Sequence, residues 1–236
     1  MTRGRLYLVP NLLGVVAPEA VLPARTIAVA RSLRCYIVEN AKPARAFLKA
    51  LEPGVPLREF RMVEVGESPL APRCAELLAP ARTGIDMGLL SDAGCPGIAD
   101  PGAAVVAQAH REGIGVVPLV GPSAVLLALM ASGMNGQAFA FHGYLPVSSE
   151  ERAQAIRRIE SDSQRNGYAQ IFIETPYRNV TMLEALAATC NPATRICVAA
   201  DLTTESESVA TRTARDWRSA DLRGYAKRPA IFVLQA

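Results

Sequence analysis

The sequence predicts an α/β protein with two lobes, each a sheet covered by helices. Short apolar, strand-like runs alternate with longer helix-like runs from Arg5 to Leu119, a pattern typical of parallel strands joined by helices. The alternation restarts after a Pro- and Gly-containing stretch, VGPSA, at Val120–Ala124. With 236 residues the chain exceeds the common domain size of about 100 to 150 residues, so we expect lobes at 1–118 and 119–236.

The first lobe is predicted to hold a mostly parallel sheet, because a helix separates each strand from the next. The strands are short runs such as RLYLV and CYIV, and the helices follow the 3.6-residue spacing of apolar side chains. The predicted strands are Arg5–Val9, Cys35–Val38, Phe60–Val65, Ile85–Leu90 and Gly115–Leu119, and the predicted helices are Glu19–Arg31, Lys42–Leu51, Leu70–Ala81 and Gly102–Arg111.

The second lobe is predicted to hold a mixed sheet. Two of its strands, Arg195–Ala200 and Ser208–Arg212, follow one another without a clear helix between them, which favours a mixed sheet over a purely parallel one. The other predicted strands are Ala138–His142, Ala169–Ile173 and Ile231–Leu234, and the predicted helices are Ser123–Ser132, Ser149–Glu160, Arg178–Ala188 and Ala214–Ala220.

Composition excludes several classes of protein. Half of the residues are hydrophobic and a fifth are charged, which is typical of a soluble globular chain. The cysteines are odd in number and form no CxxC pair, so they indicate a reducing cytoplasm and no disulfide framework. Neither histidine has a second His or Cys at metal-ligand spacing, so we expect no metal site. These residues are Cys35, Cys74, Cys95, Cys190, Cys197, His110 and His142.

Two apolar stretches resemble an export signal and a membrane span, but the first is interrupted and the helix of the second is too short. Pro10, Asn11 and Gly14 interrupt the apolar N-terminus, so we expect no signal peptide. The uncharged stretch 113–149 leaves only Ser123–Ser132 as helix, about 15 Å against a hydrocarbon core of about 30 Å. We expect that helix to be buried in protein and not in lipid.

The stretch SDAGCPGIADPG, Ser91–Gly102, is the first candidate binding loop. It directly follows the predicted strand Ile85–Leu90, and ligands of open α/β sheets bind beyond the carboxyl ends of strands. Its glycines allow backbone groups to approach a ligand closely, although the spacing is neither GxGxxG nor GxxxxGK. Two interpretations stay open: a small-molecule loop, or a connection that Asp100 caps ahead of the next helix.

Two further loops follow strands in the same way, VGPSA and ETPYRN (Glu174–Asn179). Three such loops are consistent with one shared cleft. The alternative is that Ser123 only caps its helix and that Tyr177 and Arg178 form a surface turn.

Basic side chains are concentrated in one segment of the first lobe. A basic face of this kind attracts anionic substrates such as nucleic acid or a polycarboxylate, or it is simply solvated helix surface. Aromatic residues make up only 6% of the chain, which argues against an extended stacking platform for single-stranded nucleic acid. Between Pro23 and Leu51 the basic residues are Arg25, Arg31, Arg34, Lys42, Arg45 and Lys49, against the single carboxylate of Glu39.

Four stretches, in order, resemble a known family. They are SDAGCPGIADPG, GIGVVPLVGPSAVLLALMASGM, FAFHGYLP and IFIETPYRN, and the match around them extends from about Gly84 to Leu186. They are similar to the S-adenosylmethionine-dependent tetrapyrrole methylase superfamily. The most similar branch is the ribosomal RNA ribose methyltransferases, where the corresponding stretches read SDAGTP, PGPSA, GFLP and ESPHR.

The resemblance implies two α/β lobes with S-adenosylmethionine in the cleft between them, and a homodimer. It places the methionine end of the cofactor at the SDAGCPGI stretch and at VGPSA, the predicted hinge between the lobes, and it places the adenine beside AADLT, which resembles the family's RELT segment. The implied cofactor-binding residues are Pro10, Ser91, Asp92, Ala93, Gly94, Cys95, Ile98, Ser123, Ala124, Glu174 and Leu202.

Departures from the family concern the methyl acceptor. Where the RNA branch has EDTRHTRKLL this chain has ENAKPARAFL, so Asn40, Ala41 and Pro43 replace an aspartate, a threonine and a histidine. The acceptor hypotheses are therefore RNA, a tetrapyrrole or other small anionic compound, and no acceptor at all in a cofactor-binding module. For a hydroxyl acceptor the candidate proton acceptors are Glu39, Asp100 and Glu174.

Overall fold

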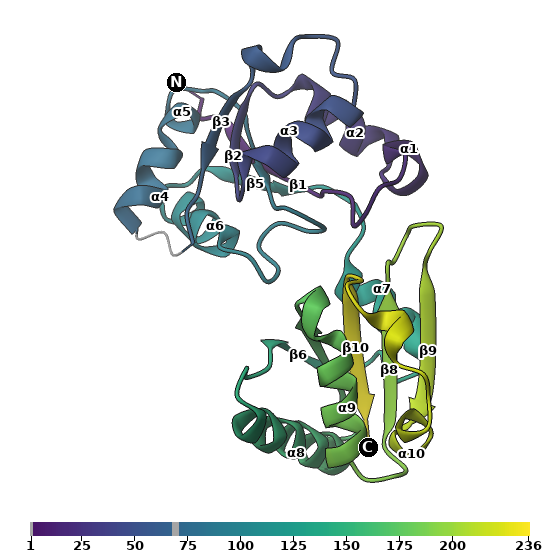
Figure 1. Ribbon diagram of the computed structural model, residues 1–236. Coiled ribbons are helices and arrows are strands. Elements are labelled where there is room, and N and C mark those ends of the chain that lie inside the picture. The colour runs from purple at the N-terminus through teal and green to yellow at the C-terminus, as the bar shows by residue number, and fades with distance from the viewer. Residues whose placement is uncertain (1, 68–70) are drawn as a thin grey trace. The chain divides into compact units, whose positions relative to one another are not determined.

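The computed structural model describes residues 2–67 and 71–236, which form two compact units, Met1–Ser123 and Ala124–Ala236 (Figure 1). Each unit holds one five-stranded sheet with its own helices. Among the described residues, no helix combines the length and the apolar character needed to cross a membrane.

The sheet of the first unit is entirely parallel, as predicted. Its strand order is β3-β2-β4-β1-β5, so β4 lies between β2 and β1. Each strand is four or five residues long, as expected of strands that are buried between two helical layers. The strands are β1 (Arg5–Val9), β2 (Cys35–Val38), β3 (Arg61–Glu64), β4 (Met87–Leu90) and β5 (Gly115–Pro118).

Helices cover both faces of this sheet, and the alternation of side chains along β2 explains how. Tyr36 and Val38 pack in one apolar cluster with α2 and α3, whereas Cys35 and Ile37 pack in a second cluster with α4 and α6. The first face carries α1 (Pro18–Val21), α2 (Ala24–Ser32), α3 (Ala41–Ala50) and the 3-10 turn η1 (Leu57–Glu59); the second carries α4 (Ala71–Leu77), α5 (Ala79–Arg82) and α6 (Gly102–Arg111).

Two helices were predicted as continuous in this unit, and the structure divides each of them into two. The predicted helix Glu19–Arg31 is divided between α1 and α2, because Pro23 forces Leu22 into an extended conformation. The predicted helix Leu70–Ala81 is likewise divided, with Leu78 between α4 and α5. The predicted start of that helix at Leu70 lies outside the described residues.

The sheet of the second unit is mixed, which confirms the prediction. Its order is β6-β7-β10-β8-β9, in which β6 and β7 are parallel and the other neighbouring pairs are antiparallel. The strands β8 and β9, which no helix separates, form an antiparallel hairpin. The strands are β6 (Phe139–Tyr144), β7 (Ala169–Glu174), β8 (Arg195–Ala200), β9 (Ser208–Thr213) and β10 (Ala230–Gln235).

The core of the second unit lies between this sheet and three helices. Phe172 stacks on Phe232, its partner in the ladder, at 5.5 Å between ring centroids. The buried indole of Trp217 donates a hydrogen bond to the carbonyl of Ile196. The three helices are α8 (Ser149–Asn166), α9 (Asn179–Thr189) and α10 (Ala214–Arg218), and the 3-10 turns are η2 (Pro176–Arg178) and η3 (Arg223–Tyr225).

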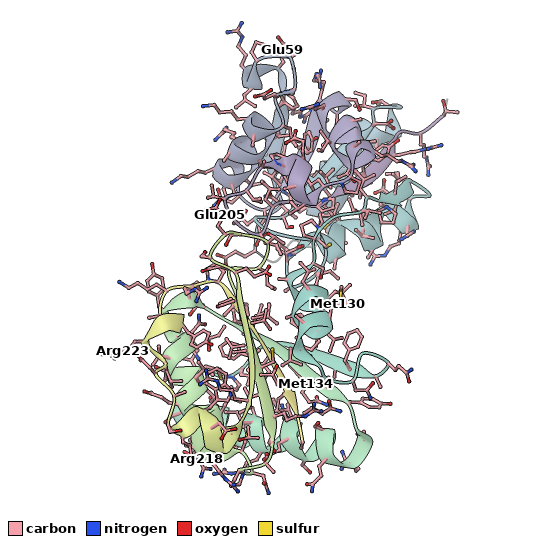
Figure 2. The ribbon with its side chains drawn as sticks, turned by 90° about the vertical axis from the view of Figure 1, so that its right-hand side faces the viewer. Glu59, Met130, Met134, Glu205, Arg218 and Arg223 are labelled. Carbon is pink, nitrogen blue, oxygen red and sulfur yellow. The ribbon has the colours of Figure 1, made fainter. Side chains whose placement is uncertain are left out.

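The remaining helix, α7 (Ala124–Ser132), packs against β8, β9 and β10. It is apolar on all sides, yet only part of it is buried. Met130 on α7 is exposed, whereas Met134, two residues beyond the helix, is buried (Figure 2). Helix α8 continues past the predicted end at Glu160 and stops at Gly167, whose φ of +69° is typical of a helix C-cap.

Candidate functional site

The topology of the first unit singles out the carboxyl end of β4. The helices that follow β1 and β2 cover one face of the sheet, whereas α6, which follows β4, covers the other. In open α/β sheets, ligands bind where neighbouring strands send their chains to opposite faces. The loop Ser91–Gly102 begins at that position, with the chain ends of β2 and β1 on its two sides.

Asn11 joins the loop to the chain that leaves β1. Its side-chain amide donates hydrogen bonds to the carbonyls of Ser91 and Asp92, both at 3.0 Å, and its backbone N–H donates to the carbonyl of Gly94 at 2.9 Å. Asn11 is buried. Sequence reasoning missed this residue; the signal was an amide side chain at the second position after a predicted strand.

Glu39 joins the loop to the chain that leaves β2. Its Oε2 accepts a hydrogen bond from the backbone N–H of Asp92 at 2.9 Å. The carboxylate of Asp92 accepts in turn from the backbone N–H of Asn40. The start of the loop is therefore fixed from both neighbouring strands.

Asp100 closes the far end of the loop on itself. Its two carboxylate oxygens accept from the N–H groups of Gly97, at 2.8 Å, and Gly102, at 2.6 Å. Gly102 is the first residue of α6 and Pro101 is its N-cap, so Asp100 accepts from the first N–H of the helix but lies one residue before the capping position that the sequence suggested. This structural duty is compatible with ligand binding by the residues at the loop's start.

The hinge segment lies directly against the same loop. A Cβ atom on Gly121 would lie 2.4 Å from the Cβ of Pro10, so only glycine fits there. The thiol of Cys95 lies 3.4 Å from the carbonyl of Pro122, to which it donates a hydrogen bond. Burial raises the pKa of this thiol, so it stays protonated. Pro10, Cys95 and the segment that leads to Ser123 are thereby brought together.

Three backbone donors in the loop are available to a ligand. Within the described residues, the N–H groups of Ala93, Gly94 and Cys95 donate no hydrogen bond. Gly94 has a φ of +68°, whereas Ala93 has a negative φ. Successive N–H groups in a turn conformation form concavities that bind anions such as a carboxylate.

Carboxylates surround these donors. Partial burial of the carboxylate within an otherwise exposed residue, and then the nearby charge of Glu39, raise the pKa of Asp92. Burial also raises the pKa of Asp100, although its hydrogen bonds from Gly102 and Gly97 oppose the shift. The side chain of Asp92 is exposed, so a cationic group has access to this negative region.

These features fit S-adenosylmethionine. The cofactor has a carboxylate, which suits the three free N–H groups, and an ammonium and a sulfonium, which suit the surrounding carboxylates. No group of three or more His, Cys, Asp or Glu side chains in the described part of the chain is arranged to hold a metal ion.

Two predicted residues of the second unit, Glu174 and Leu202, lie at the same end of its sheet, where β7 and β8 finish. Ala230 of β10 pairs with Glu174 on one side and with Ala200 on the other, so the ends of β7 and β8 flank it. The carboxylate of Glu174 is buried and lies 2.9 Å from Arg178, an ion pair without hydrogen-bond geometry. The negative charge of Glu174 is therefore already paired with Arg178 within the second unit.

The loop after β8 is strained. Asp201 and Thr203 have φ values of +50° and +73°, a region that non-glycine residues avoid. Leu202 between them is buried, and Thr203 Oγ1 is buried without a hydrogen-bond partner among the described residues. An ion pair between Asp201 and Arg228, at 2.6 Å, anchors the loop, and Glu205 projects from its outer part (Figure 2).

The predicted residues thus form two groups. The first surrounds the β4 loop, with Ile98 half exposed at its outer turn. The second belongs to the sheet edge of the other unit, with Ala124 at the start of α7. The first group is Pro10, Ser91, Asp92, Ala93, Gly94, Cys95, Ile98 and Ser123, and the second is Ala124, Glu174 and Leu202.

Solved structures with a similar fold are methyltransferases and a related synthase. The methyltransferase CobJ has a TM-score of 0.65 at 18% identity and covers 98% of this chain and 94% of its own. Uroporphyrin-III C-methyltransferase from Thermus thermophilus, in complex with S-adenosylhomocysteine, has a TM-score of 0.56 at 19% identity, over 98% and 97%. Diphthine synthase has a TM-score of 0.65 at 16% identity, over 98% and 89%. These likenesses establish the tetrapyrrole methylase fold.

Sequence similarity is more specific. No protein-family model matches the chain. Ribosomal RNA small subunit methyltransferase I of Escherichia coli O157:H7 is 31% identical over 208 residues, which are 88% of this chain and 68% of that protein. The protein of the same name from Mesorhizobium japonicum is 32% identical over 210 residues, 89% of this chain and 67% of its own. The chain therefore belongs to the ribosomal RNA small subunit methyltransferase I family, S-adenosylmethionine-dependent methyltransferases with the tetrapyrrole methylase fold.

Proposed function

We propose that this methyltransferase methylates RNA of the small ribosomal subunit and holds its cofactor at the loop Ser91–Ile98. The observation that carries the acceptor is the identity of 31% and 32%, along most of the chain, to relatives named for that RNA. The basic segment of the first unit supports the same acceptor class.

The chain's own contribution is orientation. S-adenosylmethionine supplies the methyl group on a sulfonium. We assign the N–H groups of Ala93, Gly94 and Cys95 to its carboxylate, because they lack partners among the described residues. Asn11 and Glu39 hold these donors before any ligand arrives. Alignment of reacting atoms is worth up to about 7 to 11 kcal/mol, so a preformed loop is a substantial part of catalysis.

A hydroxyl acceptor must also lose a proton, and Asp92 is the best-placed group to take it. Both oxygens of Asp100 are used within the loop, and Glu174 is paired with Arg178. Glu39 is engaged with the backbone of Asp92. The Asp92 carboxylate is exposed and its pKa is raised, so it binds a proton more readily than an ordinary aspartate.

A second acceptor class is favoured by one observation. Asn40, Ala41 and Pro43 depart from the pattern of the RNA branch, which suits a small anionic acceptor or a module that binds cofactor without turnover. The first experiment therefore separates cofactor binding from acceptor choice.

Calorimetric titration with S-adenosylmethionine and S-adenosylhomocysteine tests the loop, with Gly94→Trp as the disrupting variant. A side chain at Gly94 starts 3.2 Å from Leu13 and 3.6 Å from the Pro122 carbonyl, within the packed loop. Gly54→Trp is the matched control, because Gly54 also has a positive φ but has no atom within 4 Å of its added Cβ. We expect micromolar binding, about −8 kcal/mol, that is lost only in Gly94→Trp.

Transfer of a tritiated methyl group to small ribosomal subunits that lack the modification tests the acceptor. Label in the RNA supports the proposal. Cofactor binding with no label in the RNA would contradict it, and label in a tetrapyrrole instead would establish the second acceptor class. Absence of cofactor binding by the folded wild type would contradict the placement of the cofactor as well.

We also propose a homodimer in the cytoplasm, with lobes at 1–118 and 119–236. The resemblance to the family supports the dimer. Free cysteines among the described residues support a reducing compartment. Sedimentation equilibrium measures the assembly, and a monomer at micromolar concentration would contradict it.

A further inference from the structure

One face of α3 carries a row of three cations. Lys42, Arg45 and Lys49 are exposed and follow at intervals of three and four residues, which places them along one side of the helix. They span about 10 Å at 1.5 Å per residue. The opposite side, with Ala44, Phe47 and Leu48, is buried against the sheet.

These three charges have no partner within the chain as far as it is described. No ion pair or side-chain hydrogen bond involves them, whereas Arg31 and Arg34 of the same segment are engaged with backbone carbonyls. Glu64 lies near the start of α3, but its carboxylate accepts from the backbone N–H of Ala41.

Two of the three charges lie at unfavourable places for their own helix. Lys42 lies in the first turn, where the helix dipole disfavours a positive charge, and that turn contains no acidic residue. Lys49 lies in the last turn, where the dipole favours it, but Arg45 is a like charge four residues away, which costs about a few tenths of a kcal/mol. Charges that form no pair within the described chain, and that do not improve the helix as a set, point to an external anion.

The row begins beside the cofactor loop. Helix α3 starts directly after Glu39 and Asn40, the two residues that exchange hydrogen bonds with Asp92. The departures from the RNA branch leave the helix intact at this end. Asn40 caps it by accepting from the N–H of Lys42 at 3.0 Å, and Pro43 lies in the first turn, where no helical N–H is required.

We propose that Lys42, Arg45 and Lys49 bind the phosphates of the RNA strand and lead the target nucleotide to the loop at Asp92. This inference rests on the proposed RNA acceptor. The only aromatic residue of α3, Phe47, is buried, so the row contacts the backbone and does not read bases. Cations on the row and carboxylates on the loop also separate the anionic substrate from the cationic cofactor.

The test compares two triple variants of the full chain. Lys42→Gln, Arg45→Gln and Lys49→Gln together remove the row. Arg157→Gln, Arg158→Gln and Arg215→Gln together remove the same charge from exposed positions of the second unit. Anisotropy of a short fluorescein-labelled single-stranded RNA is measured between about 50 and 200 mM potassium chloride, and calorimetry with S-adenosylmethionine confirms that each variant is folded.

We expect the row variant to bind RNA more weakly and with a shallower salt dependence. Each phosphate contact to a single strand adds about 0.7 to the log–log slope, so three contacts add about 2. The control variant should retain most of the wild-type slope, and both variants should bind the cofactor as the wild type does.

An unchanged slope in the row variant, with RNA still bound and methylated, would overturn this inference and leave the proposed function intact. Equal losses in both variants would also overturn it, because net charge alone would explain the binding. Weakened binding of a porphyrin polycarboxylate, with RNA binding unaffected, would assign the row to a small acceptor. A wild type that neither binds nor methylates RNA would overturn the proposed function together with the inference.

Discussion

The loops after β4 and β8 hold irregular backbone in different ways. The start of the β4 loop reaches positive φ at Gly94 and Gly97, where glycine adopts it without strain, and neighbouring strands fix it through Asn11 and Glu39. Its one non-glycine residue with a positive φ is Ala99, at +61°, next to Asp100, whose carboxylate closes the far end of the loop. The β8 loop reaches positive φ at two non-glycine residues, and the ion pair between Asp201 and Arg228 anchors it.

This difference has a physical consequence for binding. A glycine loop leaves its N–H groups open to a ligand, and hydrogen bonds from adjacent strands supply rigidity without side chains in the way. A strained loop stores about 1 to 3 kcal/mol at each unusual residue and persists only where its surroundings hold it. The first loop is therefore suited to contact a ligand through its backbone, and the second through a fixed shape.

The largest expected effect tests the rigidity of the β4 loop. Asn11→Ala removes two buried donors and leaves the carbonyls of Ser91 and Asp92 unsatisfied, so it should cost about 2 to 3 kcal/mol of unfolding free energy. Affinity for S-adenosylmethionine should fall at least about tenfold, because the loop must then be ordered on binding. Urea denaturation and calorimetry measure the two effects.

Gln170→Ala is the control for Asn11→Ala. Gln170 is a buried amide on β7 that contacts His142 and the Tyr168 carbonyl, far along its strand from Glu174. Its loss should destabilise the second unit but leave cofactor affinity unchanged. If both variants lose affinity alike, general destabilisation and not the Asn11 contacts explains the result.

The sequence was informative about elements and less so about their interruptions. Hydrophobic periodicity predicted the strands of both sheets, and the missing helix before Ser208 predicted that the second sheet is mixed. It failed at Pro23 and near Leu78, where a local backbone restriction ends a helix although the apolar spacing continues. Periodicity reports which side is buried, and it does not report where the backbone can turn.

Contacts between segments that are distant along the chain could not be predicted from the sequence. The β4 loop was identified from its glycines and its place after a strand, but the contacts of Asn11 and Glu39 depend on a strand order that inserts β4 between β2 and β1. Glu39 was one of three candidate proton acceptors, and its hydrogen bond with the backbone of Asp92 could not be predicted from its position in the sequence. Spacing along the chain contains no information about such pairs, whereas the sheet order determines them.

Two substitutions, one that removes a glycine from the β4 loop and one that adds a glycine to the β8 loop, should change the unfolding free energy in opposite directions by about 1 kcal/mol. Gly94→Ala should destabilise by about 1 to 2 kcal/mol, because alanine at a φ of +68° is strained. Thr203→Gly should stabilise by about 1 kcal/mol, because it relieves the φ of +73° and removes the unpartnered Oγ1. Thermal unfolding measures both signs. If Thr203→Gly also lowers the unfolding free energy, the positive φ of Thr203 does not strain the β8 loop.

The smallest expected effect concerns the charge of the β4 loop and its dependence on pH. Since the pKa of Asp92 is raised in the folded state, the folded chain binds a proton more tightly than the unfolded chain, and this group reduces stability as pH rises through its folded pKa. Asp92→Asn should therefore raise the unfolding free energy at neutral pH by at most about 0.5 kcal/mol, because the group is exposed. The gain should vanish once the pH falls below the usual range of aspartate, where the wild-type carboxyl is protonated in both states.

The same variant should lower methyl transfer if Asp92 accepts the proton, so a more stable yet less active protein is the expected signature. A variant that is fully active at neutral pH would remove Asp92 from the proton transfer and leave only its charge in the comparison.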